Sequence, residues 1–250
     1  RAFDNLNTTG FPTHKKGNED WKYTDVNKIL QNEYKLFDND LKTTDKYKDI
    51  ISNLPSYNSG NYLIFINGVF MPEISQISND SIIIDSLGNN LEKYSSIIYP
   101  HLESLPEAKD PFINFNTALF QDGVFIYLPK NTKLSTPIQV INIESNNSPG
   151  EHFVISPLIL VIADNESYVD LEEYCLGSDS SSNLINTVFK FVVSESSQLN
   201  YSRFQNYSEK TNNVNNTLVT LKKNATFNSF YLDFGGQIIR NKIPKISNFS

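Results

Sequence analysis

The spacing of apolar residues changes character part-way along the chain. Up to about residue 115, helical spacings alternate with short strand-like runs. From Val124 onward the apolar residues fall in short segments, rich in β-branched and aromatic side chains and separated by Asn, Ser, Gly and Pro. Alternation of apolar and polar positions between such turn residues is typical of β-strands. We therefore expect a small mixed α/β domain over residues 1–115 and an all-β domain over 116–250.

The first region contains helical patterns and one hairpin. EDWKYTDVNKILQ (19–31) and TTDKYKDIISNLP (43–55) each place apolar residues along one helical stripe, and NNLEKYSSIIYPHLESL (89–105) predicts a third helix. Thr24 and Asp25 are candidate caps of the first helix, and Pro55 ends the second. NYLIFINGVFMP (61–72) has an Asn-Gly pair between two apolar runs, which predicts a β-hairpin. SIIIDSL (81–87) predicts a further strand.

A repeat runs through the second region. LPKNTKLSTPI, ADNESYVDLEEY, VSESSQLNYSRF and LKKNATFNSFYL each contain a polar corner, a small residue and, two positions later, an apolar one. The small residues are spaced by 35, 30 and 28 positions: Thr132, Ser167, Ser197 and Ala225. Their apolar partners are Leu134, Val169, Leu199 and Phe227. The same alignment places Leu171 with Tyr201, and Tyr174 with Phe204 and Leu232.

A period near 30 residues made only of strands and turns favours a β-solenoid, in which inward side chains stack in columns on successive coils. The competing interpretation is a β-sandwich, which also has short strands at regular spacing. A solenoid has two ends with unpaired backbone groups that must be covered. We expect the region before Val124 to cover the first end, and another chain or further residues to cover the end near Ser250.

Composition narrows the classes of function. The 250 residues are 39% hydrophobic, with 13 Tyr and 17 Phe, enough aromatic area for a real core. The net charge of −7 and the lack of a basic run make nucleic acid an improbable partner. No apolar stretch reaches the length of a membrane helix, and RAFDNLNTTG does not resemble a signal peptide. A single cysteine fits a reducing compartment, so we expect a cytoplasmic protein.

Few residues are equipped for chemistry. His14, His101 and His152 lie far apart in the sequence and show no metal-binding spacing. Cys175 follows a predicted strand and is expected to be a buried, inert thiol rather than a nucleophile or a cluster ligand. We therefore assign no catalytic, cofactor-binding or metal-binding residue.

Three carboxylates offer an alternative function. Asp170 and Glu172 share the outward face of a predicted strand, next to Glu173. On a β-helix such acids could cleave a polysaccharide or bind Ca²⁺, and the alternative hypothesis is a carbohydrate-active β-helix protein using these residues. No acids recur at Asn200 and Ser202 in the next coil, and we find no run of exposed aromatic residues to hold a sugar. Solvated side chains on a strand are the simpler interpretation.

Three sequence elements carry a resemblance to a known family. They are FPTHKKGNEDWKYTDVNKIL (11–30), NTALFQDG (116–123) within a longer similar stretch, and FGGQIIRNKIPK (234–245). Together, and in this order, they resemble the SufB/SufD family of the SUF iron–sulfur cluster assembly machinery. The Glu-Asp-Trp-Lys-Tyr-Thr element favours the SufD branch.

The resemblance implies a right-handed parallel β-helix and a non-enzymatic scaffold subunit. It implies pairing with SufB through the β-helix and binding of the SufC ATPase through a C-terminal helical domain that is absent from this chain. It also implies that an iron–sulfur cluster forms transiently in the full complex, with no cofactor held by this chain. Neither Cys175 nor any other residue here matches a cluster ligand of the family.

Overall fold

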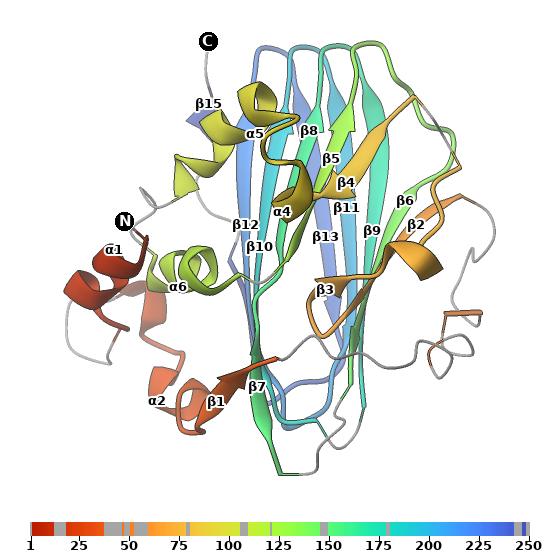
Figure 1. Cartoon of the computed structure of the whole chain (residues 1–250). Coiled ribbons are helices and arrows are strands. Elements are labelled where there is room, and N and C mark those ends of the chain that lie inside the picture. Colours follow the sequence, from red (N-terminus) through yellow and green to blue (C-terminus); the bar gives the residue numbers. More distant parts are fainter. Residues whose placement is uncertain are drawn as a thin grey trace.

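The computed structural model describes most of the chain. The described residues are 2–12, 19–37, 47, 51–52, 60–78, 81–105, 110–120, 122–145, 150–178, 181–242 and 247–248. Figure 1 shows long strands stacked side by side, with short helices to one side of them. Among the described residues, no helix has the length and hydrophobicity needed to cross a membrane.

The first half of the chain contains both helices and strands. Its elements are α1 (Ala2–Thr9), the 3-10 helix η1 (Glu19–Trp21), α2 (Val26–Ile29), β1 (Tyr34–Leu36), β2 (Asn61–Ile66), β3 (Val69–Phe70), the 3-10 helix η3 (Pro72–Ile74), β4 (Ile83–Ser86), α4 (Leu87–Asn90), α5 (Ser95–Leu102) and α6 (Pro111–Leu119). The first predicted helix is split into η1 and α2, since Asp25 caps α2 by accepting a hydrogen bond from the Asn27 N–H. Most of the second predicted helix lies outside the described residues. The predicted hairpin is confirmed: β2 and β3 are antiparallel, and both turn residues have positive φ, Asn67 at 49° and Gly68 at 82°.

The second half consists of strands. They are β5 (Gly123–Leu128), β6 (Ile138–Glu144), β7 (His152–Ile155), β8 (Leu158–Ala163), β9 (Tyr168–Gly177), β10 (Leu184–Val193), β11 (Gln198–Asn206), β12 (Asn212–Leu221), β13 (Thr226–Asp233), β14 (Ile238–Lys242) and β15 (Ser247–Asn248). The strands alternate between two sheets along the chain, which we call sheet A and sheet B. Sheet A includes β5, β8, β10, β12 and β14; sheet B includes β6, β9, β11 and β13.

Strand pairing favours the solenoid over the sandwich. From β5 onward, every described neighbouring pair in both sheets is parallel, for example β9 with β11 and β10 with β12. A β-sandwich is built of antiparallel strands instead. The chain therefore coils, and each turn lays one strand on sheet A and the next on sheet B.

The corners of the coil repeat in detail. Asn131, Glu166, Ser196 and Asn224, which precede the four small residues, all have φ between 56° and 65°. Each of the first three donates its N–H to the coil above: Asn131 to the carbonyl of Asn165, Glu166 to that of Glu195, and Ser196 to that of Lys223. The small side chain after each left-handed residue leaves space for the bend, and Ser167 and Ser197 are buried there.

The predicted interior column is confirmed. Leu199 is in register with Val169 on one side and Phe227 on the other, and Leu134 follows Lys133, which bridges to Tyr168. These side chains share one hydrophobic cluster with apolar residues of sheet A such as Phe189 and Phe191. Burial of this column, from which water is excluded, stabilises the stacking of successive coils.

The two ends of the solenoid differ. At the first end, β2 pairs with β6 and β4 pairs with β5, so the mixed region extends both sheets, as expected. At the other end, β13 is the last described strand of sheet B, whereas β14 and β15 both pair with β12 in sheet A.

The N-terminal segment reaches across sheet A to β14. Trp21 stacks on Phe112 of α6 at 4.9 Å between ring centroids, and the Arg240 guanidinium lies 4.0 Å from the centre of the Trp21 ring. Arg240 also donates to the Asp20 carbonyl at 2.6 Å and to the Thr24 hydroxyl at 3.3 Å. Two of the sequence elements that carry the family resemblance therefore contact each other directly.

We expect Arg240→Met to loosen this contact. It removes two hydrogen bonds and one cation–π contact, which together stabilise by about 1–3 kcal/mol. Urea unfolding monitored by Trp21 fluorescence measures the change. As a control, Lys223→Met removes an exposed ion pair to Glu195 with a 3.9 Å separation and should change stability by less than about 0.5 kcal/mol. Equal effects of the two substitutions would contradict a specific contact.

Candidate functional site

The interior of the solenoid has an apolar part and a polar part. Between the sheets, the strand ends next to the corners carry the apolar cluster already described. Further along the same strands the inward positions become polar. We call this second part the polar compartment; it consists of Asn142, Glu144, Glu173, Cys175, Arg203, Gln205, Tyr207, Asn213 and Asp233.

Arg203 is the centre of the polar compartment. Its side chain is 1% exposed, and its Nε lies 3.0 Å from the carboxylate of Glu173, which is equally buried. The Tyr201 hydroxyl donates a hydrogen bond to the same carboxylate, and Asn142 donates its amide N–H at 2.8 Å. Burial opposes the charge of Arg203, but the neighbouring acidic groups of Cys175, Glu173 and Tyr201 outweigh it and raise the pKa of the guanidinium. The guanidinium is therefore charged.

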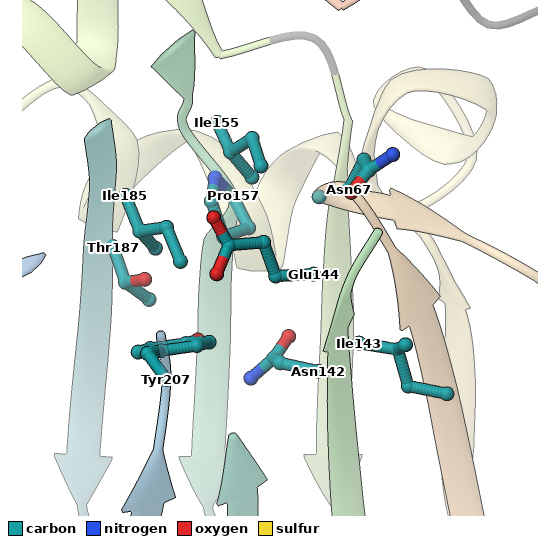
Figure 2. A pocket seen from close by; sticks show the side chains of 10 residues that line it. Asn67, Asn142, Ile143, Glu144, Ile155, Pro157, Ile185, Thr187 and Tyr207 are labelled. Atoms are coloured by element: carbon teal, nitrogen blue, oxygen red, sulfur yellow. The ribbon is translucent and has the colours of Figure 1, made fainter. Parts of the chain in front are cut away.

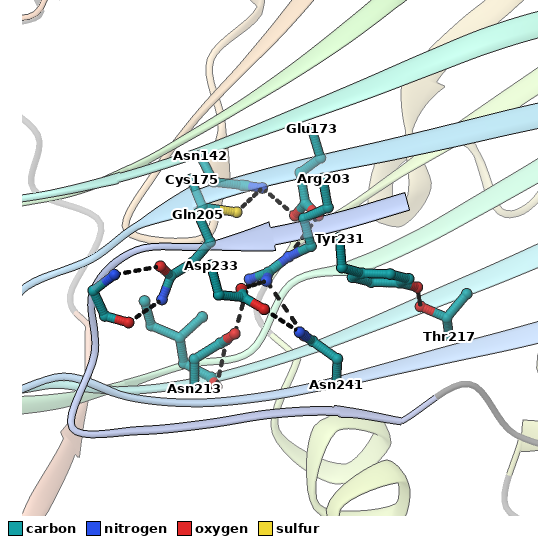
Figure 3. A network of polar contacts seen from close by, with 12 residues as sticks. Asn142, Glu173, Cys175, Arg203, Gln205, Asn213, Thr217, Tyr231, Asp233 and Asn241 are labelled. Atoms are coloured by element: carbon teal, nitrogen blue, oxygen red, sulfur yellow. Dashed lines mark hydrogen bonds and ion pairs between the residues drawn. The ribbon is translucent and has the colours of Figure 1, made fainter. Parts of the chain in front are cut away.

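The other side of Arg203 faces the last coil. One terminal nitrogen lies 2.8 Å from Asp233 of β13, and the other donates to Asn213 of β12 at 2.8 Å. Asn241 of β14 accepts a hydrogen bond from Arg203 and donates to Asp233 at 2.6 Å. Figure 3 shows this network joining strands of both sheets. The Arg203 guanidinium, on β11, thus contacts side chains of four other strands, β9, β12, β13 and β14.

Cys175 is enclosed within β9, not after the strand as the sequence suggested. Its thiol is fully buried, and the Asn142 amide nitrogen lies 4.0 Å from Sγ. Burial raises the pKa of Cys175 to about 12, and the nearby Glu173 charge acts in the same direction. A thiol that keeps its proton and has no access to solvent is a poor nucleophile and a poor metal ligand. The predicted buried, inert thiol fits this environment.

Glu144 borders a small cavity at the edge of the polar compartment. The Thr211 hydroxyl donates to its carboxylate at 2.9 Å, and Figure 2 shows the carboxylate among Pro157, Thr187 and Tyr207. The cavity has a volume of about 10 Å³, which is the size of one water molecule. Burial raises the pKa of Glu144 to about 7, although hydrogen bonds from Thr211 and Asn183 oppose the shift. The cavity is too small for a substrate or a cluster.

This pKa predicts a pH-dependent stability. The folded chain holds a proton on Glu144 that the unfolded chain releases above its ordinary pKa of 4.5. The stabilisation that the folded state gains from the Glu144 proton is therefore fully present below about pH 4.5 and is lost as the pH rises through about 7. The free energy of unfolding should fall by about 3 kcal/mol over this range because of this group. Glu144→Gln should remove this part of the pH dependence. Urea unfolding at about pH 5 and about pH 8 measures it, and an unchanged pH profile in the variant would contradict the assignment.

The Gly-Gly pair closes the compartment. A Cβ on Gly235 would lie 2.0 Å from the carbonyl oxygen of Tyr207, and Gly236 has a φ of 100°. Gln205 exchanges two hydrogen bonds with the Gly235 backbone, at 2.9 and 3.2 Å. The expected sharp bend is therefore present at Gly235 and Gly236, and it packs the backbone closely against Tyr207 and Gln205 of the preceding coil.

The NTALFQDG element joins the two halves of the chain. Asn116 is fully buried and donates to the carbonyls of Pro157 and Asn186, which fixes α6 to sheet A. Asp122 accepts hydrogen bonds from the N–H groups of Phe70 and Gly123. A Cβ on Gly123 would lie 2.3 Å from the carbonyl of Leu158. The element is thus a structural junction rather than a catalytic loop.

The three candidate carboxylates do not form one site. Asp170 and Glu172 point outward from β9, as predicted, but Glu173 points into the interior and pairs with Arg203. Asp170 accepts hydrogen bonds from Tyr168 and Asn200, and Glu172 accepts them from Gln139 and Tyr174. Glu173, on the opposite face of the sheet, cannot act on the same bond as Asp170 or Glu172, and each of these two outward carboxylates already accepts hydrogen bonds from two neighbouring side chains. The arrangement therefore gives no support to the carbohydrate-active alternative.

The histidines remain separate. His101 lies in α5 and His152 in β7, where its Nδ1 is 2.7 Å from the Ser182 hydroxyl; His14 lies outside the described residues. Burial, with the nearby charges of Lys190 and Lys222, lowers the pKa of His101. Within the described parts of the chain, no group of three His, Cys, Asp or Glu side chains could hold a metal ion.

The buried ion pair was not predicted from the sequence, although the repeat contains a signal for it. Arg203 follows Glu173 by 30 residues, the same spacing that separates Ser197 from Ser167. Both residues also have the inward parity of Leu171 and Tyr201. Extending the column alignment to charged positions would have placed the pair in register inside the solenoid.

The fold and this closed interior define a β-solenoid protein whose ionisable interior groups are used for packing. The chain matches the family described as SufBD protein N-terminal region over residues 1–140, and the SufBD core domain of the SUF system for FeS cluster assembly over residues 144–247. The protein therefore belongs to the SufBD family.

Similar curated proteins agree with this assignment. An iron–sulfur cluster assembly SufBD family protein of Synechocystis sp. is 22% identical over 97% of this chain and 54% of its own length. Similar proteins of Guillardia theta (29% identical) and Staphylococcus epidermidis (30% identical) align over 55% and 56% of this chain and over 28% and 30% of their own lengths. The chain spans about half the length of the Synechocystis relative.

Proposed function

We propose that this chain is part of a SufD-type scaffold subunit for iron–sulfur cluster assembly, with no active site of its own. The observation that carries the proposal is the match to both SufBD regions, in order, over residues 1–140 and 144–247. The SufD branch is proposed from the Glu19–Thr24 element, Glu-Asp-Trp-Lys-Tyr-Thr.

The interior chemistry supports a scaffold. Glu173 and Arg203 neutralise each other, the Cys175 thiol is enclosed, and the cavity beside Glu144 has room for one water molecule. Groups that bind or transform a substrate must be reachable by it, and these are not. The iron–sulfur cluster is then cargo of the assembled complex and not a cofactor of this chain.

The proposed partners are SufB and SufC. SufB would pair with the β-helix, and the SufC ATPase would bind a C-terminal region beyond the residues described here. The proposed location is the cytoplasm, where the single, buried cysteine fits a reducing environment.

Co-purification of the full-length parent protein with candidate SufB and SufC tests the proposal. A stable assembly of the three proteins is expected, together with no ATPase or cysteine desulfurase activity in the parent protein alone. Failure to retain either partner, or measurable activity of either kind in the pure protein, would contradict it.

A further inference from the structure

The outer face of sheet B carries a continuous apolar column. Side chains in register across five strands point outward, each beside the next: Ile64, Ile141, Tyr174, Phe204 and Leu232. A residue pair in register on neighbouring strands lies within contact distance, so these side chains form one stripe across the sheet. The aromatic residues of this stripe lie on separate strands and so do not form a run in the sequence.

The first part of the stripe is covered by the chain itself. Ile64 and Ile141 are at most 1% exposed, and they share a hydrophobic cluster with Tyr47, Ile51 and Met71. Tyr47 and Ile51 are four positions apart, the spacing that places two side chains on one face of a helix. The chain thus covers this part of the stripe with apolar side chains from outside the sheet.

The remaining part of the stripe is open. Tyr174 and Phe204 stack at 5.3 Å between ring centroids, and Phe230 lies 6.2 Å from Phe204. Phe230 is 54% exposed, and Phe234 at the end of β13 is 71% exposed. Adjacent aromatic side chains at the surface mark interaction sites more often than isolated ones do. We call Tyr174, Phe204, Phe230 and Leu232 the open stripe.

The charged side chains on the outward face of the strands that carry the open stripe are all acidic. Asp170 and Glu172 are outward residues of β9, and the outward positions of β9, β11 and β13 include no Lys or Arg. Arg203, the only cation in these three strands, points inward. A partner with basic side chains flanking its apolar residues complements this surface.

The dimensions favour a helix. The open stripe crosses from β9 to β13, two strand spacings or about 10 Å. On a helix, positions i and i+7 are also about 10 Å apart along the axis and lie on one face. Apolar residues at i, i+4 and i+7 of a helix therefore match the length of the open stripe.

We propose that the open stripe binds a basic amphipathic helix of a separate protein, which continues the cover provided by Tyr47 and Ile51. The inference rests on the proposed scaffold function, because a scaffold requires docking surfaces. It names a surface on the outer face of sheet B that neither the interior network nor the N-terminal contact with Arg240 uses.

A designed peptide tests this proposal without SufB or SufC. The probe is a fluorescein-labelled helical peptide of Leu, Ala and Lys with Leu at i, i+4 and i+7; a second peptide has the same composition in scrambled order. Fluorescence anisotropy with the intact chain should show binding of the first peptide only. The double variant Phe204→Ser/Phe230→Ser should weaken binding at least about tenfold, because both rings are removed from the contact. Asn228→Ser changes an outward polar residue of β13 that is not part of the open stripe, so it should leave the affinity unchanged.

Several results would overturn the proposal. Equal binding of the scrambled peptide, or unchanged affinity in the double variant, would remove the stripe as a specific site. A monomer–dimer equilibrium that the double variant abolishes would identify a second copy of the chain as the occupant instead. Urea unfolding of the double variant establishes that it is folded. Since SufB and SufC are absent from the experiment, its failure leaves the co-purification test of the scaffold function intact.

Discussion

Arg203→Met is expected to destabilise the folded chain by about 3–5 kcal/mol, because it leaves the carboxylate of Glu173 buried without its counter-charge. Asp233 and Asn213 lose a partner in the same substitution. A loss of this size is a large part of the stability of a typical domain. Urea unfolding, monitored by circular dichroism and by Trp21 fluorescence, measures it.

A double variant distinguishes the effect of the unpaired buried charge from the effect of lost side-chain packing. In Glu173→Gln/Arg203→Met the buried charge is removed together with its partner, and the amide can still accept a hydrogen bond from Tyr201. We expect the double variant to be more stable than Arg203→Met alone, since pairs in contact are strongly non-additive. If the two variants were equally unstable, the lost side-chain packing, and not the isolated carboxylate, would be the cause.

Leu199→Ala is expected to destabilise by about 2–5 kcal/mol, the cost of a cavity in a packed core. Leu199 is fully buried between Val169 and Phe227 in the interior column, so neighbouring coils lose contacts on both sides. The measurement is again the free energy of unfolding in urea. Thr226→Ala, at an exposed outward position of β13, is the matched control and should change it by less than about 0.5 kcal/mol. A similar cost at both positions would mean that the column is not the core.

Much of the solenoid could be predicted because its signals are local and repeat. A left-handed corner residue, a small residue and an apolar one recur at Asn131, Glu166, Ser196 and Asn224. The hairpin at Asn67 and Gly68 likewise depends on two adjacent residues. In each case the information lies within a few positions of the structure that it specifies.

The rest depends on contacts between distant segments. Nothing near Trp21 indicates that Arg240 will lie over its ring, because the two residues are brought together only after the coils have stacked. The pairing of Glu173 with Arg203 required applying the 30-residue spacing to charges as well as to apolar residues. The open stripe was missed for a related reason: its aromatic residues lie on three different strands, so no single segment looks like an aromatic run.

The three elements that resemble the SufBD family lie where distant parts of the chain meet. Glu19–Thr24 and Gly235–Arg240 meet at the Trp21–Arg240 contact, and the element around Asn116 fixes α6 to sheet A. Each element has a role in joining distant parts of the chain.

The solenoid interior depends on the register in which successive coils stack, and disulfide cross-linking between neighbouring strands measures that register. In a Cys175→Ser background, Asn200→Cys/Asn228→Cys places two thiols on residues that are in register on β11 and β13, about 5 Å apart and within reach of a disulfide. Asn200→Cys/Leu232→Cys shifts one thiol by four positions, about 13 Å along the strand. Mild oxidation should cross-link the first pair rapidly and the second pair not at all. Efficient cross-linking of the second pair, with none of the first, would contradict the register and with it the solenoid interior described here.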